Sequence, residues 1–137
     1  MAYIDWKESY SVGIKLMDEH HKKLISIINE LHEGISSGDS EKALRKTLSA
    51  LVDYTKYHFT AEESLMTQYE YPEYSTHKES HQKLLKALSD LQHQYEEKKG
   101  GLTIILKIEN FLSNWLINHI LESDKKYGPY LNSKGVI

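Results

Sequence analysis

Histidine and carboxylate side chains stand at ligand-like spacings in the middle of this sequence. His58 lies four residues before Glu62, and His77 lies four residues before His81. Residues four apart on an α-helix are stacked neighbours, so each pair would point to one side of its helix. Imidazole and carboxylate groups are metal ligands, and a pair on one helical face can chelate an ion. The two pairs therefore predict a metal site shared by two helices.

A break at Tyr71-Pro72 separates the two pairs. Proline lacks the backbone N–H group and disfavours helical angles in the residue before it. A short connection makes consecutive helices antiparallel neighbours, which brings the end of the first helix beside the start of the second. We therefore expect the four ligands of the two pairs to lie at one level.

The composition restricts both the kind of metal site and the kind of partner. The 137 residues contain no cysteine, which excludes zinc ribbons, iron-sulfur clusters, c-type haem attachment and thiol catalysis. A net charge of -3 and a pI near 6.2 argue against nucleic-acid binding, and Lys98-Lys99 is expected to be a solvated loop. The N-terminus resembles no secretion signal, and no apolar run is long enough to span a bilayer. We expect a soluble, cytoplasmic protein without membrane insertion.

Four amphipathic helices are expected to carry the candidate ligands, because apolar residues recur in steps of three and four. The first helix is expected from Met17 to Gly38, and the second begins after an N-cap at Asp39 or Ser40. The third begins after Pro72 and stops at Gly100-Gly101, and the fourth carries an interior stripe from Ile105 to His119. Residues 1–16 contain too many apolar side chains for a disordered tail and are expected to pack on the helices. The sequence thus predicts an all-α protein: one domain, residues 1–137, folded as an up-down-up-down antiparallel four-helix bundle with a packed N-terminal arm.

Spacing separates the eight histidines into two groups. Those on the interior stripes are His21, His58, His77, His81 and His119. In an antiparallel bundle these five and Glu62 come to the same end. The other three, His20, His32 and His93, lie off the stripes and are expected to be solvated. Asp124 follows His119 by five residues, so it reaches the group only if the helix loosens or tilts there.

A metal centre explains this group better than an ordinary core does. A single interior histidine could be a hydrogen-bonded core residue, but five imidazoles and a carboxylate in one layer would each need a polar partner. One ion takes at most six ligands of this type. With Asp124 the group has seven donors, which suggests two ions bridged by carboxylates. The ligand types suit iron, copper, nickel or zinc. Carboxylate-rich di-iron bundles are disfavoured, because no Glu-x-x-His motif occurs in the chain.

A set of motifs that spans nearly the whole chain adds a resemblance. The motifs are Trp6, Ser11 to Ile14, Asp18 to His21, His58-Phe59 to Glu62-Glu63, Tyr71-Pro72, His77 with His81, and Trp115-Leu116 to Asp124. In these motifs the sequence resembles the hemerythrin family, and within it the single-domain bacterial members. It departs from the family at His20, where Gln is common.

The resemblance implies a centre of two non-haem iron ions. One iron would be bound by His77, His81 and His119, and the other by His21 and His58. Both carboxylates, Glu62 and Asp124, would bridge the two ions together with an oxo or hydroxo group. Counting donors then gives six ligands to the first iron and five to the second, so dioxygen would bind at the second. Residues beside the ligands are predicted to form an apolar wall around the gas: Phe59, Trp115, Leu116 and Ile120.

The function that follows is reversible dioxygen binding, for storage, transport or scavenging, without enzymatic turnover. Dioxygen is the expected partner, and an unidentified protein recipient is possible. Two alternatives from other classes stay open. One is an oxygen or redox sensor that signals through a partner surface. The other is a di-iron enzyme that reduces peroxide or nitric oxide, or that oxidises iron.

Overall fold

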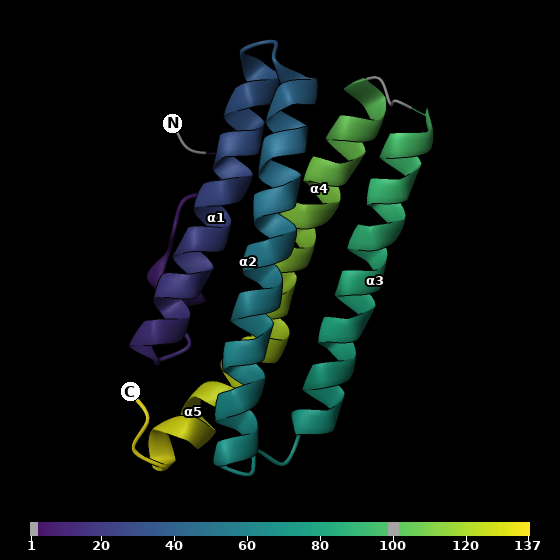
Figure 1. Cartoon of the computed structure of the whole chain (residues 1–137). Coiled ribbons are helices and arrows are strands. Elements are labelled where there is room, and N and C mark those ends of the chain that lie inside the picture. The colour runs from purple at the N-terminus through teal and green to yellow at the C-terminus, as the bar shows by residue number, and fades with distance from the viewer. Residues whose placement is uncertain (1–2, 99–101) are drawn as a thin grey trace.

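Four long helices stand side by side and alternate in direction (Figure 1). The computed structural model describes residues 3–98 and 102–137. The helices are α1 (Lys15–Ser36), α2 (Ser40–Gln68), α3 (Tyr74–Lys98) and α4 (Leu102–His119). The predicted up-down-up-down bundle is therefore confirmed. The start of α1, the end of α2, the start of α3 and the end of α4 meet at the lower end of the bundle in Figure 1.

The helix ends follow the sequence signals with one exception. Gly38 adopts a φ of +93°, the left-handed conformation that ends a helix, as predicted. Asp39 occupies the N-cap of α2, as predicted, although its side chain makes no capping hydrogen bond. Lys98 is the last residue of α3 rather than part of a loop. Lys99 and the predicted stop at Gly100-Gly101 lie outside the described residues.

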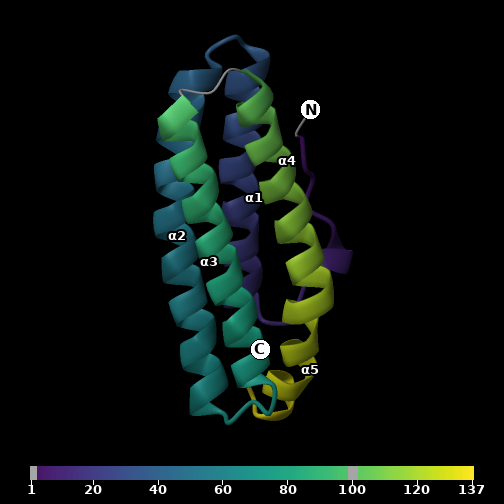
Figure 2. The ribbon, with the colours of Figure 1, turned by 90° about the vertical axis from the view of Figure 1, so that its right-hand side faces the viewer.

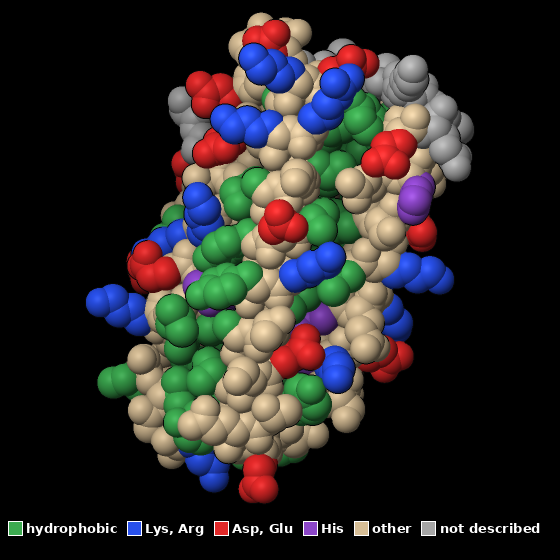
Figure 3. Space-filling model, in the orientation of Figure 1, with side chains coloured by type: hydrophobic (Ala, Val, Ile, Leu, Met, Phe, Trp, Pro, Cys, Tyr) green, Lys and Arg blue, Asp and Glu red, His purple; other side chains and the backbone are tan. Residues whose placement is uncertain are grey.

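Apolar side chains spaced by three and four residues fill the space between the helices. Each helix contributes a stripe of them, and burying one such side chain stabilises the fold by about 1.5–3 kcal/mol. The stripes include Leu24, Ile28 and Leu31 on α1, Leu44, Leu48 and Leu51 on α2, Leu84 and Leu88 on α3, and Ile105, Ile108 and Leu112 on α4. Lys and Arg side chains are interspersed with Asp and Glu on the face shown in Figure 3.

The N-terminal arm packs along α1 and α4, as predicted (Figure 2). The backbone N–H and C=O of Ile4 bond to the side-chain amide of Asn29, at 2.8 and 2.9 Å. Val12 and Ile14 are buried in the core. Within the described residues, no helix combines the length and the apolar character that crossing a membrane requires.

The C-terminal part of the chain closes the lower end of the bundle. Beyond α4 the helix widens into a π-helical turn, η2 (Ile120–Asp124), and continues as a short helix, α5 (Lys125–Ser133). Figure 1 shows α5 below the start of α1 and beside the end of α2. It lies so close to the arm that a Cβ atom on Gly128 would stand 2.1 Å from the Val12 carbonyl oxygen. Sequence periodicity did not predict this fifth helix.

Candidate metal centre

Seven buried histidine and carboxylate side chains come together at the lower end of the bundle. They form two groups, and within each group the ligand atoms all lie within 4.8 Å of one another. The larger group consists of Glu62, His77, His81, His119 and Asp124, and the smaller of His21, His58, Glu62 and Asp124. We call the seven residues the donor cluster. Both groups contain Glu62 and Asp124, so the two carboxylates stand between two sets of imidazoles.

Asp124 faces both sets of imidazoles with different oxygens. Its Oδ1 lies 3.0 Å from the Nε2 atoms of both His77 and His119. Its Oδ2 lies 2.9 Å from Nε2 of His21. One carboxylate therefore contacts α1, α3 and α4, in a layout that suits a ligand bridging two cations.

Glu62 has a similar place on the other side of the donor cluster. Its Oε1 lies 3.1 Å from Nε2 of His81 and 3.5 Å from Nε2 of His58. Its Oε2 lies 3.8 Å from Nε2 of His21. This carboxylate therefore also contacts both sets of imidazoles.

The π-helical turn explains how Asp124 reaches the donor cluster. A π-helix bonds each N–H to the carbonyl five residues earlier, whereas an α-helix bonds it to the fourth. Residues five apart therefore stack on one face, as residues four apart do in an α-helix. Asp124 follows His119 by five residues, and η2 spans the residues between them. The helix therefore loosens between His119 and Asp124, as the sequence analysis required for Asp124 to reach the other ligands.

Three imidazoles of the donor cluster are oriented by hydrogen bonds at the nitrogen that faces outward. Nδ1 of His81 bonds to Oε2 of Glu63 at 3.0 Å, and Nδ1 of His119 bonds to Oγ of Ser80 at 3.3 Å. Nδ1 of His58 lies 2.8 Å from Nδ1 of His20. In each case the outer nitrogen has a partner and Nε2 is left to face the carboxylates, an arrangement typical of metal-binding histidines.

Spacing alone did not find these three partners. Each is adjacent in sequence to a member of the donor cluster: His20 precedes His21, Glu63 follows Glu62, and Ser80 precedes His81. A neighbouring residue is turned about 100° around the helix, so it faces the adjacent helix rather than the bundle axis. This adjacency was the available signal.

The prediction that His20 is solvated is wrong. Only 5% of the residue is exposed, because its side of α1 faces α2, where it packs against the rings of Tyr54 and Tyr57. Burial, and then the nearby His21, lower the pKa of His20. His32 is only partly solvated, since its ring stacks on Tyr3 and its Nδ1 lies 3.1 Å from Glu109. His93 is exposed, as expected.

The chemistry of the donor cluster fits a bound cation. Within the described residues, several of its buried polar atoms have no hydrogen-bond partner, and each such atom costs about 1–3 kcal/mol. They include Nε2 of His21, His77, His81 and His119, Oε1 of Glu62, and both carboxylate oxygens of Asp124. All of these atoms face the same small volume, so one or two cations would satisfy them together.

The ionisation of the donor cluster supports the same conclusion. Burial opposes the charge on Asp124, yet the neighbouring imidazoles, His119 above all, hold its pKa well below the usual range. Burial lowers the pKa of His58 to about 4, so its ring is neutral at pH 7, as a metal ligand must be. Burial opposes the charge on His77 as well, but the nearby carboxylates of Asp124 and Glu62 raise its pKa to about 9. The buried carboxylates thus demand positive charge at this place.

Tyr127 supports the donor cluster from α5. Its hydroxyl donates a hydrogen bond to Oε2 of Glu62. The side chain is 1% exposed, and burial, together with the charge of Glu62, raises its pKa well above 10. The phenol therefore remains a donor at any physiological pH. Sequence reasoning missed this residue, because spacing did not predict α5.

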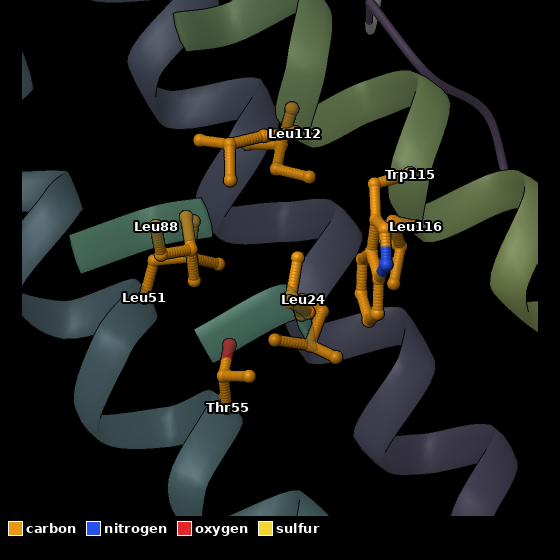
Figure 4. Close-up of a pocket in the computed structure, with 9 residues that line it drawn as sticks. Leu24, Leu51, Thr55, Leu88, Leu112, Trp115 and Leu116 are labelled. Atoms are coloured by element: carbon orange, nitrogen blue, oxygen red, sulfur yellow. The ribbon is translucent and has the colours of Figure 1, made fainter. Parts of the chain in front are cut away.

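A small apolar cavity lies between the four long helices (Figure 4). It measures about 10 Å³, close to the room that one water-sized molecule needs. Its lining residues come from all four long helices: Leu24, Ile28, Leu51, Thr55, Leu84, Leu88, Leu112, Trp115 and Leu116. The lining residues lie three to seven positions from a member of the donor cluster on the same helix, which places the cavity roughly 4.5 to 10.5 Å further along the bundle axis.

The four residues predicted to form the apolar wall have different positions. Trp115 and Leu116 line the cavity, and the Trp115 ring stacks on His119 at 4.7 Å. Phe59 stacks on His81 at 3.6 Å. Ile120 is fully buried at the start of η2. Phe59 and Ile120 do not line the cavity.

Comparison with known proteins gives the family of this chain. Residues 12–131 match the family model described as the hemerythrin HHE cation binding domain. The chain belongs to the hemerythrin family. The resemblance in the sequence motifs is thereby confirmed, and a buried cluster of histidine and carboxylate side chains agrees with a cation-binding domain.

Individual members of the hemerythrin family match over nearly the whole chain. The Bacteriohemerythrin of Methylococcus capsulatus is 32% identical over 134 residues, which cover 97% of this chain and 100% of that protein. The Bacteriohemerythrin of Pseudomonas aeruginosa is 32% identical over 127 residues, 93% of this chain and 80% of that protein. A crystal structure of wild-type hemerythrin superposes with a TM-score of 0.82 at 31% identity, covering 93% of this chain and 97% of that one.

Proposed function

We propose that the donor cluster holds two iron ions and that the protein binds dioxygen reversibly. The observation that carries this proposal is the sharing of Glu62 and Asp124 by two groups of imidazoles. Two carboxylates with one set of histidines on each side suit a pair of bridged ions, whereas a single ion would leave one set without a partner. The named relatives support the same class of centre.

The proposed ligand sets follow from the two groups. His77, His81 and His119 bind one ion, and His21 and His58 bind the other. Both ions share the carboxylates, so the ion with two histidines has one protein ligand fewer than its neighbour. When bound, a pair of iron ions supplies two electrons and an open coordination position, which are what reversible dioxygen binding requires.

The chain's own residues favour binding over further reaction. Glu62 and Asp124 would offset part of the charge of the ions, and the oriented imidazoles would hold the ions in place. Among the described residues that line the cavity, none carries an ionisable group, and Thr55 is the only one with a hydroxyl. Such a lining disfavours water and offers no acidic group, so it would not protonate a gas molecule beside it. We therefore propose a carrier, store or scavenger rather than an enzyme. The cytoplasmic location and a protein recipient remain predictions of the sequence.

Metal analysis and spectroscopy of the iron-loaded protein test the proposal. We expect two iron atoms per chain. The reduced protein should develop a visible absorption band with dioxygen, and should lose it under vacuum over several cycles. One iron per chain, or tightly held zinc alone, would refute the two-ion centre. Decay of the band within a single turnover, together with sustained catalysis when an electron donor is added, would favour the peroxide- or nitric-oxide-reducing enzyme.

A further inference from the structure

His20 and His58 form an unusual contact, because two imidazoles meet through the same kind of nitrogen. Their Nδ1 atoms lie 2.8 Å apart, with the ring centroids 5.0 Å apart and the rings inclined by 76°. Both side chains are buried, His20 at 5% and His58 at 1% exposure. At this distance one nitrogen must carry the proton and the other must accept it.

The surroundings of His58 decide which ring is the donor. Its Nε2 belongs to the smaller group of metal-ligand atoms, 3.5 Å from Oε1 of Glu62. A histidine nitrogen that binds a metal ion carries no proton, so the proton of neutral His58 resides on Nδ1. His58 therefore donates the hydrogen bond, His20 Nδ1 accepts it, and the proton of neutral His20 is on its Nε2.

Two tyrosines hold His20 in the orientation that accepts this bond. Its ring meets Tyr54 edge-on at 5.8 Å, with an angle of 75° between the planes. It meets Tyr57 at 5.3 Å and 46°. Tyr57 is 60% exposed, so the order from solvent inward is Tyr57, His20, His58 and then the carboxylates. His20 is thus the group that separates His58 from water on this side.

We propose that His20 is a positioning residue for His58 and thereby controls how firmly one of the two ions is held. The inference rests on the proposed two-ion centre. By accepting the Nδ1–H bond, His20 fixes the His58 ring with Nε2 toward the carboxylates and increases the electron density on that nitrogen. The ion affected is the one bound by His21 and His58, which has the open position for dioxygen. Two histidines of the neighbouring ion have hydrogen-bond partners of their own: His81 bonds to Glu63, and His119 bonds to Ser80. That ion therefore does not depend on His20.

Three substitutions in the iron-loaded full chain test this role. His20→Leu removes the acceptor, whereas His20→Gln offers a side-chain carbonyl that can accept the same bond. The matched control is Ser80→Ala, which removes the bond to His119 at the other ion. If His20→Leu does not fold, His20→Met takes its place, since a thioether is only a weak acceptor. The measurements are the Mössbauer spectrum of both ions and the rate at which each leaves to a chelator.

The expected results differ between the two ions. In His20→Leu one of the two iron signals should shift, and that ion should leave roughly 10–100-fold faster than in the wild type. His20→Gln should restore most of the wild-type rate, and Ser80→Ala should change the other signal. If both ions leave His20→Leu at the wild-type rate, the role of His20 is overturned. It is also overturned if His20→Gln does not restore the slow release of the affected ion. A wild-type stoichiometry other than two would instead refute the proposed function.

Discussion

At the scale of single residues, the donor cluster depends on side chains that surround it. Tyr127 is one of these: a phenol from α5 whose hydroxyl donates to Glu62 inside the protein. Glu62 faces imidazoles on one oxygen and this hydroxyl on the other, so the tyrosine sets the rotation of the carboxylate. Hydrogen bonds to charged groups contribute more than those between neutral groups, and their loss leaves a buried acceptor without a donor.

Tyr127→Phe should therefore destabilise the protein by about 1–3 kcal/mol, because Oε2 of Glu62 loses its donor. The free energy of unfolding, measured by urea denaturation at a fixed iron content, checks this value. Tyr57→Phe is the matched control, since within the described residues the Tyr57 hydroxyl makes no hydrogen bond, and it should change stability by less than about 0.5 kcal/mol. A Tyr127→Phe protein as stable as the wild type would show that this bond contributes nothing net.

The sequence predicted which side chains gather, but not what holds them in place. The 3.6-residue period fixes the angle of a residue around its helix, and the alternation of helix direction fixes its height. Those two coordinates were enough for His21, His58 and Glu62. The partners of the outer nitrogens, His20 among them, depend on which helix packs against which side, and the spacing within one helix carries no such information.

At the scale of elements, the contact of α5 with the N-terminal arm is close enough to require glycine. Alanine usually stabilises a helix relative to glycine by up to about 1 kcal/mol. At position 128, however, the added Cβ would lie 2.1 Å from the Val12 carbonyl oxygen. Relief of that clash requires α5 or the arm to move, and overpacking of this kind costs about 1–3 kcal/mol. The cost of overpacking is therefore larger than the gain in helix propensity from alanine.

Gly128→Ala should accordingly lower the midpoint of thermal unfolding, whereas Lys126→Ala, on an exposed position of the same helix, should leave it nearly unchanged. Circular dichroism at 222 nm follows both transitions. A Gly128→Ala protein that melts at or above the wild-type temperature would contradict the close approach of α5 to the arm.

The turn at η2 shows where prediction from periodicity fails for a physical reason. A π-helical turn contains one more residue than the α-helical pattern allows, and short turns of this kind often occur at functional sites. The five-residue spacing from His119 indicated that Asp124 reaches the donor cluster only if the helical period widens. Spacing could not predict that the wider turn forms. The cost of that turn is offset by contacts of Asp124 with His21 and His77, which lie on other helices.

At the scale of the whole molecule, the donor cluster is the least favourable part of the fold without a cation. Several of its buried atoms lack hydrogen-bond partners within the described residues, and two carboxylates lie together at 1% exposure. A cation that binds the folded chain and not the unfolded one adds stability that grows with the logarithm of its free concentration relative to the dissociation constant. We therefore expect metal binding and folding to be coupled in this protein.

Removal of metal should lower the unfolding midpoint by roughly 10 °C or more, since binding at a thousandfold excess over the dissociation constant is worth about 4 kcal/mol. Thermal melts of the chelator-treated and the iron-loaded protein provide the comparison. Equal midpoints for the two samples would mean that the donor cluster does not bind metal in the folded state.

Asp124 has a consequence for how the protein is made. This carboxylate belongs to both groups of donors, yet it follows all four long helices in the sequence. A chain still being synthesised presents His21, His58 and Glu62 long before His119 and Asp124 leave the ribosome. Neither group of donors is complete until Asp124 has left the ribosome. In the proposed two-ion centre, the metal pair can therefore bind only after that point, and a chain terminated before Asp124 would not hold it.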